Sequence, residues 1–475
     1  MKKVSTLLLL ALVSFNLSAQ KMSKDKKAVV ASVEKHKENL IKISDSIWAL
    51  AETAFEESIS SELLADYAEQ NGMTVTRGVA DIPTAFVATY GSGKPVISVL
   101  GEFDALPGLS QNTVPTKDPR IDGAPGHGCG HNMFGAASLG AAIAIKEQIE
   151  AGNIKGTVKF FGTPAEEKFF GKVWMVEAGL WDDVDVNVSW HPSAEIEADV
   201  QSGLALVDFM VEFYGQAAHA SADPWNGRSA SDALELYTTG INYYREHIKP
   251  TSRIHYHIQD GGQVVNVVPD YARLWVRVRD PKREVMLPTF ERVKAMAEGA
   301  AIMANVDYKY SLISGIYETL VNREGGKIMQ NNLELLGPIT YTEEEITFGK
   351  AIQEATGKPQ VGMDGDIHPL KETEELPGGG STDVGDVSWN VPNINLGVTV
   401  APKGTPWHSW AVVACGGMSI GHKGMVYASK AMGMTMFDLF DDPKLVEKVK
   451  EEFKTRKGDV KYEAMIDGPP PIPGK

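Results

Sequence analysis

The spacing of apolar positions predicts alternating helices and strands in the first part of the chain. Residues 26–50 carry apolar side chains three and four positions apart, which is typical of an amphipathic helix, and 132–150 form a helix rich in small residues. Apolar runs predict strands at 84–90, 96–100, 157–161 and 184–189. Strands that alternate with helices favour a mostly parallel α/β sheet.

The pattern changes near residue 204 and changes back near residue 317. Between these points the segments follow the order strand, helix, strand, strand, helix, strand, which is typical of a compact α+β unit of about 110 residues. A strand at 393–400 and a helix at 416–440 then resume the first pattern. The sequence therefore predicts a main α/β domain in two parts, 20–203 and 318–467, interrupted by a smaller inserted domain at 204–317.

The two ends of the chain have their own compositions. Lys2 and Lys3 precede an apolar run and a short polar stretch that ends at Ala19, which is the layout of a secretory signal. We expect residues 1–19 to be a signal peptide and the mature protein to be periplasmic or extracellular; the alternative is a buried amino-terminal helix. Residues 468–475 are rich in Pro and Gly, and we expect a disordered tail there.

The composition argues against two classes of binding partner, nucleic acids and membranes. The 475 residues carry a formal net charge of −16 and no basic run, so a nucleic-acid partner is not expected. Beyond the signal, no uninterrupted apolar stretch is long enough to span a bilayer, so no membrane partner is expected for the mature form. The two cysteines, Cys129 and Cys415, are too few for a disulfide framework.

Candidate metal ligands follow the predicted strands. Cys129 and His131 lie in a glycine-rich loop that opens a helix, and both types of side chain bind transition metals. Glu166 and Glu167 directly follow the strand at 157–161, where one carboxylate could bind metal and the other could take a proton from water. The alternatives are a helix-start loop with an incidental His and a pair of acids that complement a helix dipole.

Two further histidines have the same relation to strands. His191 follows the strand at 184–189, and His408 follows the strand at 393–400. A single loop histidine is more often structural than functional. Because the carboxyl ends of parallel strands meet at one edge of a sheet, all these side chains together indicate one shared metal site.

The motifs that contain these residues resemble those of the aminoacylase and carboxypeptidase superfamily of metal-dependent amidohydrolases, closest to its aminobenzoyl-glutamate hydrolase branch. The resemblance runs from about residue 30 to 460 and rests on segments 101–107, 129–132, 163–167, 190–192, 381–389, 421–425 and His408. It implies a catalytic α/β domain, a lid-and-dimerisation insert and two divalent metal ions, Zn or Mn. The implied ligands are Cys129, His131, Glu167, His191 and His408.

The resemblance also implies catalytic roles. Glu166 becomes the general base, and Asp104 orients a ligand. Two departures from the wider superfamily leave the metal open: Cys129 stands where many relatives have a bridging Asp, and Glu102-Phe103-Asp104 lacks the usual His. A thiolate favours Zn over Mn by its softness.

Substrate-binding residues are expected mainly in the insert. The resemblance implies that His219 polarises the scissile carbonyl across a dimer interface, and that Asn266 binds the polar end of the substrate. Arg277 and Arg279 share one face of a strand, and either could clamp a carboxylate; the alternative is a solvated strand face. Gly380 lies in a glycine-rich turn that could place backbone N–H groups near substrate.

Together these features predict a two-metal hydrolase of amide bonds in N-acyl or N-aroyl amino acids, of the aminobenzoyl-glutamate kind, or in dipeptides. We expect a small-molecule amide substrate and a homodimer, and a second kind of subunit is a further option. Two alternatives are a metal-dependent binding protein without catalysis and an enzyme that uses Cys129 as a nucleophile.

Overall fold

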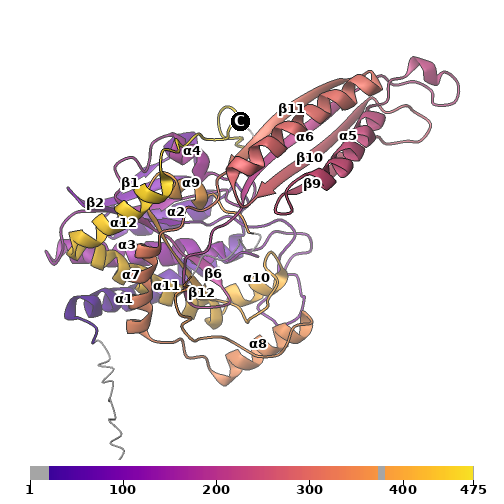
Figure 1. The fold of residues 1–475 in the computed structure, drawn as a ribbon. Helices are drawn as coiled ribbons and strands as arrows, with labels where there is room; N and C mark the ends of the chain where they lie inside the picture. The colour runs from indigo at the N-terminus through magenta and orange to yellow at the C-terminus, as the bar shows by residue number, and fades with distance from the viewer. Residues whose placement is uncertain (1–20, 373–379, 474–475) are drawn as a thin grey trace, which may run out of the picture.

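The computed structural model describes residues 21–372 and 380–473, which form a main domain and an inserted arm (Figure 1). The main domain is built on a sheet with strand order β1-β2-β4-β3-β5-β12-β6, and β7 pairs with β12. Its strands are β1 (Thr74–Arg77), β2 (Phe86–Gly91), β3 (Val96–Gly101), β4 (Thr157–Gly162), β5 (Val186–Val188), β6 (His191–Ser193), β7 (Glu197–Asp199) and β12 (Asn393–Thr399).

The prediction of a mostly parallel sheet is confirmed. The pairs β3–β4, β3–β5, β5–β12 and β12–β6 are parallel, whereas β1, β2 and β7 join the sheet through antiparallel pairs. Consequently the carboxyl ends of β3, β4, β5 and β12 lie along one edge.

Helices α3 (His131–Glu150) and α11 (Ser419–Asp441) pack on the sheet, and α1 (Lys24–Leu50) packs against both of them. Ser23 caps α1 by accepting from the backbone N–H of Lys26. The small residues of α3 allow close packing, since a Cβ at Gly140 would lie 2.5 Å from Ser429 Oγ and 2.6 Å from a methyl of Leu40. The start of α3 is thereby held at the edge where the strands end.

The remaining helices of the main domain are shorter or lie farther out. They are α2 (Ser58–Gln70), α4 (Lys172–Glu177), α7 (Arg323–Leu336), α8 (Glu343–Ala355), α9 (Val384–Ser388), α10 (Trp410–Gly416), α12 (Pro443–Lys457) and the 3₁₀ turn η1 (Val79–Asp81). No helix within the described ranges is long and apolar enough to cross a membrane.

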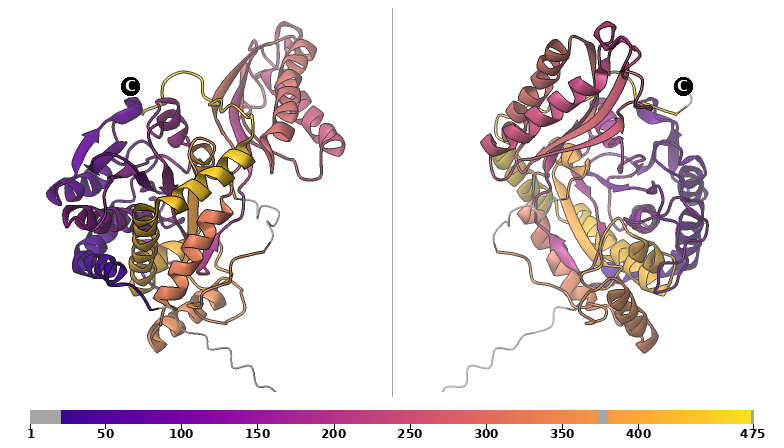
Figure 2. Two further views of the ribbon diagram at one scale, coloured as in Figure 1. Left: turned by 60° about the vertical axis from the view of Figure 1, so that its left-hand side comes forward. Right: turned by 90° about the vertical axis from the view of Figure 1, so that its right-hand side faces the viewer.

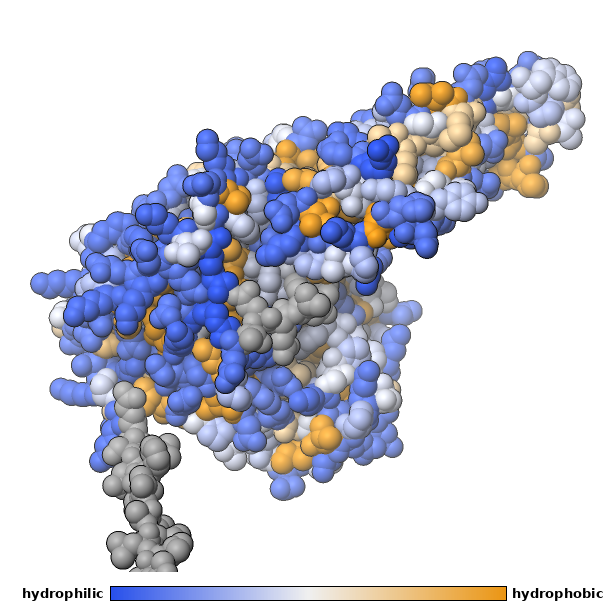
Figure 3. Space-filling model, in the orientation of Figure 1, coloured by the Kyte–Doolittle hydropathy of each residue, from blue (hydrophilic) through white to orange (hydrophobic). Residues whose placement is uncertain are grey.

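The insert is a four-stranded antiparallel sheet in the order β11-β8-β10-β9, with two helices packed on one face (Figure 2). The elements are β8 (Ala205–Tyr214), η2 (Pro224–Asn226), α5 (Ala230–Tyr244), η3 (Arg245–His247), β9 (Arg253–Asp260), β10 (Tyr271–Asp280), α6 (Arg283–Ala304) and β11 (Asp307–Ile316). Its sheet begins and ends one residue inside the boundaries expected from the sequence. The insert projects from the main domain, and apolar residues are exposed along its outer part (Figure 3).

The expectations for the two chain ends have different outcomes. The expected signal peptide at 1–19 lies outside the described residues. Residues 468–473 form no helix or strand, yet they lie against the main domain: Trp174 Nε1 donates to the carbonyl of Gly468 over 3.0 Å, and Ile472 packs on the core. This corrects the expectation of a disordered tail for 468–473, because its apolar side chains are partly buried against the main domain.

Candidate metal centre and active site

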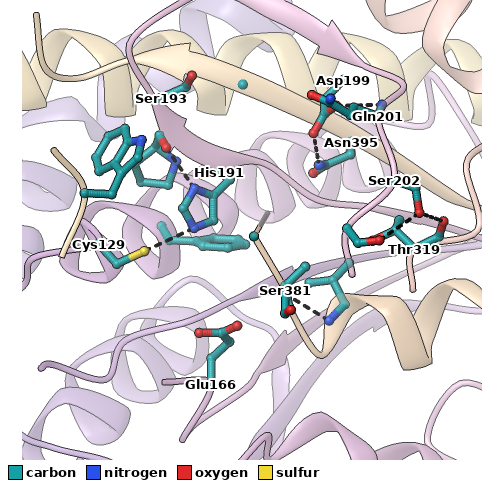
Figure 4. Close-up of a pocket in the computed structure, with 18 of the residues that line it drawn as sticks. Cys129, Glu166, His191, Ser193, Asp199, Gln201, Ser202, Thr319, Ser381 and Asn395 are labelled. Carbon is teal, nitrogen blue, oxygen red and sulfur yellow. Dashed lines mark hydrogen bonds between the residues drawn. The ribbon is translucent and has the colours of Figure 1, made fainter. Parts of the chain in front are cut away.

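The residues singled out in the sequence come together where the parallel strands end. Glu102 and Asp104 follow β3, Glu166 and Glu167 follow β4, and His191 begins β6 just after β5. Figure 4 shows Cys129, Glu166 and His191 directed toward a common space. The local rule that functional groups gather at the carboxyl ends of strands therefore holds here.

Cys129 lies at the centre of two groups of possible ligands. Its sulfur lies within 4.8 Å of ligand atoms of His131 and His191, and likewise within 4.8 Å of ligand atoms of Glu167 and His408. Cys129 Sγ is 3.4 Å from His191 Nε2, and His408 Nε2 is 3.4 Å from Glu167 Oε2. One thiolate could therefore bridge two cations, each with two further ligands.

Neighbouring groups fix how the ligands are turned. His131 Nδ1 is 2.9 Å from Asp104 Oδ1, and His191 Nδ1 is 2.8 Å from the carbonyl oxygen of Pro192. Asp104 Oδ2 accepts from the backbone N–H of Glu167 over 2.9 Å. Since each Nδ1 is engaged, each Nε2 faces the site, which is the usual arrangement of metal-binding histidines.

The chain is also constrained next to these groups. Ala165 adopts a left-handed backbone conformation (φ 62°), and its N–H donates to Glu57 Oε1 over 2.9 Å. His408 is likewise left-handed (φ 55°), and its N–H donates to the carbonyl of Gly128 over 3.0 Å. Non-glycine residues adopt this conformation only where the surroundings hold them, so both loops are held in one shape.

Buried atoms without partners test whether metal ions fit. Among the described residues, His131 Nε2, Glu102 Oε2 and Glu167 Oε1 are buried and form no hydrogen bond, although such atoms are normally paired. Five carboxylates meet at this site with one buried ammonium, Lys172, a formal excess of four negative charges. The carboxylates belong to Glu102, Asp104, Glu166, Glu167 and Asp383. Two divalent cations would balance that charge, so the donor set fits them.

The pKa shifts of the side chains at the site are consistent with bound cations. Burial raises the pKa of Glu167 to about 7, and burial together with the charges of Glu102 and Glu167 raises the pKa of Glu166 well above its usual value. Burial and Glu167 also raise the pKa of the Cys129 thiol, whereas burial lowers the pKa of His191 to about 4. A cation would favour the ionised thiol and carboxylates, while an unaided nucleophilic Cys129 would be disfavoured.

The site opens into a cavity of about 650 Å³ between the main domain and the insert. Such a volume suits a small molecule with one or two polar ends. Glu166, Cys129 and His191 line the cavity, and so do polar side chains from several other elements (Figure 4). These side chains are Ser193, Glu197, Asp199, Gln201, Ser202, Thr319, Ser381 and Asn395.

Two of the expected substrate-binding residues line this cavity. Arg279 enters it from β10, and Gly380 borders it, with its carbonyl accepting from the N–H of Leu204 over 2.8 Å. Arg277 also lines the cavity, but its Nε donates to Asp208 Oδ1 over 2.7 Å within a buried ion pair. Both arginines thus reach the cavity from β10, and Asp208 holds the Arg277 side chain in place.

His219 and Asn266 do not belong to the cavity of their own chain. Both are exposed on loops of the insert, where His219 pairs with Val267 and the N–H of Ala220 donates to the Asn266 carbonyl over 3.0 Å. The two motifs thus meet each other but not the metal ligands. Any role at a catalytic site would have to be played at the site of another chain.

Sequence reasoning missed Lys172 and Asp383. Lys172 Nζ lies 2.7 Å from Glu102 Oε1 and 2.6 Å from Asp383 Oδ1. Asp383 belongs to the motif at 381–389, which was a usable signal. Lys172 had none, because a lysine at the start of a helix is usually a surface residue.

Comparison with known proteins identifies relatives over most of the chain. Residues 99–465 match the family described as Peptidase family M20/M25/M40. The chain is 38% identical to one of the subunits of p-aminobenzoyl-glutamate hydrolase from Escherichia coli (strain K12), covering 89% of this chain and 93% of that protein. It is 27% identical to Xaa-Arg dipeptidase of Mus musculus, with 92% and 94% covered.

Solved structures share the fold. A putative aminohydrolase from methicillin-resistant Staphylococcus aureus superimposes with a TM-score of 0.63 at 18% identity, covering 87% of this chain and all (100%) of that one. A dinuclear metal binding peptidase of Bacillus subtilis superimposes with a TM-score of 0.56 at 18% identity, covering 86% and 99%.

Proposed function

The chain belongs to the peptidase family M20/M25/M40, as its motifs predicted, and we propose that it hydrolyses amide bonds of N-acyl or N-aroyl amino acids or of dipeptides with two divalent metal ions. The observation that carries the proposal is the position of Cys129, which is shared by two ligand groups at the base of a cavity of small-molecule size. A shared ligand would hold two ions close together, as they are in two-metal hydrolytic sites.

Cys129, His131 and His191 would hold one ion, and Cys129, Glu167 and His408 the other. The bound ions would polarise the amide carbonyl and make a water molecule acidic enough to attack it. Zn and Mn both remain candidates, with the thiolate favouring Zn.

Glu166 is the proposed general base. It is 7% exposed and lines the cavity beside the ligands. Burial and neighbouring negative charge raise its pKa, so that it can accept a proton from the attacking water and pass it to the leaving amine. Asp104 holds both His131 and the backbone of Glu167 in position.

Arg279 would bind the carboxylate of the amino-acid part of the substrate, and the Gly380 turn would border it. A relative at 38% identity is named for p-aminobenzoyl-glutamate and another at 27% for Xaa-Arg dipeptides. Both substrates are amides whose amine part is an amino acid, and this is the class we propose here.

His219 and Asn266 would complete the site of a second chain, in a homodimer or with a different subunit. Their exposed position far from their own cavity supports this. Two relatives are named as different subunits of one hydrolase, which makes the second option reasonable. We also propose export, which rests on the sequence of residues 1–19 alone.

Metal removal and a substrate panel test the function. The protein stripped with a chelator should lose hydrolysis of N-acyl, N-aroyl and dipeptide substrates, and Zn or Mn should restore it. An enzyme that used Cys129 as a nucleophile would survive stripping. A metal-dependent binding protein would bind the panel but release no product with either metal.

A further inference from the structure

One carboxylate at the metal centre has no role in the five-ligand set. We propose that Glu102 is a further protein ligand, through Oε2, of the ion held by His131, and that Lys172 holds Glu102 in the ligating orientation. The inference rests on the proposed two-metal function and adds to it a sixth ligand and a positioning residue.

The two oxygens of Glu102 have different surroundings. Its side chain is 1% exposed, and Oε1 lies 2.7 Å from Lys172 Nζ. Oε2 lies 3.1 Å from His131 Nε2, yet neither of these two atoms forms a hydrogen bond. A buried carboxylate oxygen and a buried imidazole nitrogen that lie this close without a hydrogen bond are suited to bind one cation together.

The simplest alternative is a protonated His131 held between two carboxylates, and the grouping of Glu102 with other candidate ligands favours ligation instead. His131 already has Asp104 on Nδ1, at 2.9 Å, so Nε2 is the nitrogen left for a ligand. His131 belongs both to the group with Cys129 and His191 and to a group with Glu102 and Glu166, each within 4.8 Å. His131 therefore connects Glu102 to the group that contains the thiol.

Lys172 is a buried residue whose ammonium group contacts Glu102. At the first position of α4 it is fully buried (0% exposed), and its Nζ lies 2.6 Å from Asp383 Oδ1. Its backbone N–H donates to the other oxygen of Asp383 over 2.9 Å, so the lysine is fixed at both ends. An ammonium with two carboxylate partners fixes the orientation of Glu102, and Glu102 links Lys172 to His131.

The first test replaces Glu102. Glu102→Gln keeps the shape but removes the anionic ligand, and we expect at least about a 10-fold loss of affinity at one of two cation sites. Affinity is measured by chelator competition, with the absorption spectrum of the Co(II)-loaded protein as a second readout. Glu318→Gln is the matched control, because Glu318 is also buried (4% exposed) but accepts from the N–H of Arg283 at the start of α6.

A shorter side chain separates ligation from charge. Glu102→Asp keeps the negative charge but withdraws the oxygens by one methylene. A ligand role predicts a loss close to that of Gln and a changed Co(II) spectrum. If Asp restores wild-type affinity and spectrum, Glu102 acts by charge alone and the ligand assignment is wrong.

The second test asks whether Lys172 acts through Glu102. Lys172→Gln should weaken the same cation site about 10–100-fold, the usual cost of losing a group that orients a ligand. Lys146→Gln is the control, since Lys146 is also buried (7% exposed) and paired with Glu150 at 2.6 Å, but on the far part of α3. The double variant with Glu102→Gln should be no weaker than the worse single variant.

The outcomes separate this inference from the proposed function. A wild-type protein that binds two cations but hydrolyses nothing in the panel contradicts the function and leaves the ligand set standing. Glu102→Gln protein that binds both cations with unchanged affinity and spectrum overturns the inference, whatever its activity. Thermal unfolding of each metal-free variant shows whether a loss of binding is only a loss of folding, in which case Glu102→Asp decides.

Discussion

Replacing Glu166 with Gln is the sharpest test of the proposed mechanism, because Gln has almost the same shape. The side chain is 7% exposed and lines the cavity, so the variant should fold and bind substrate as before. It cannot take a proton from water. Loss of a general base costs about 10²–10⁴ in rate, or roughly 3–5 kcal/mol at 1.36 kcal/mol per factor of ten.

The adjacent carboxylate supplies the comparison. Glu167 lies with Cys129 and His408 in one ligand group, and its backbone is held by Asp104. Glu167→Gln should therefore weaken metal binding, and excess metal should recover part of the activity. Glu166→Gln should keep its metal content, and added metal should change nothing.

Turnover and bound metal are measured on the same preparations of both variants. Glu166 also lies within 4.8 Å of ligand atoms of Glu102 and His131, so a ligand role is a real alternative. If the Glu166 variant loses metal and the Glu167 variant keeps it, the two roles are reversed. If both variants retain near-normal turnover, the metal-activated mechanism itself is refuted.

Three further predictions concern other parts of the molecule. Cys129 and Cys415 are both buried and unbonded, so denatured, metal-stripped protein should show two free thiols; a disulfide between them in active protein would contradict the ligand role of Cys129. Glu166→Gln and His219→Ala proteins, each inactive alone, should recover about a quarter of wild-type activity when mixed chains exchange in a two-fold dimer, and no recovery would exclude a site shared between chains. The mature protein from its native host should begin near Gln20, and an intact amino terminus would rule out export.

The sequence predicts the elements that carry the site better than those around it. Helix α3 (His131–Glu150) and strand β4 (Thr157–Gly162) lie within one residue of expectation, because a continuous apolar pattern marks both. Helix α7 was missed, since Gly325 and Gly326 at its start are typical of a turn. A Cβ at Gly325 would lie 2.4 Å from Ile394, so that glycine reflects packing on β12, which the local sequence does not contain.

The helix expected at 416–440 shows the same limit. It corresponds to α11 (Ser419–Asp441), which begins three residues later than expected, after α10 ends at Gly416 and the chain turns around Gly417. A Cβ there would lie 2.7 Å from the ring of Trp48, far away in the sequence. Local periodicity cannot reveal a break that a distant aromatic ring requires.

At the site, sequence motifs were sufficient to predict the residues that lie next to a strand end or a helix start. Cys129, His131 and Glu167 are examples, since their spacing from a strand or a helix start is itself the signal. Lys172 is the opposite case: it is 70 residues from Glu102 and 211 from Asp383 along the chain. Only the tertiary fold brings these three charges together, so no spacing rule could have found them.

His219 and Asn266 are an intermediate case. Their motifs were recognised in the sequence, but their position outside the cavity of their own chain was not. The loops that carry them lie near strongly exposed apolar side chains, with Val265 99% and Trp225 70% exposed. Apolar groups concentrated at the end of a projecting arm are usual where another protein surface docks (Figure 3). A polar pair surrounded by such groups has no substrate to meet on its own chain. We therefore expect the arm to reach the cavity of a second chain, and mixing the two inactive variants decides whether it does.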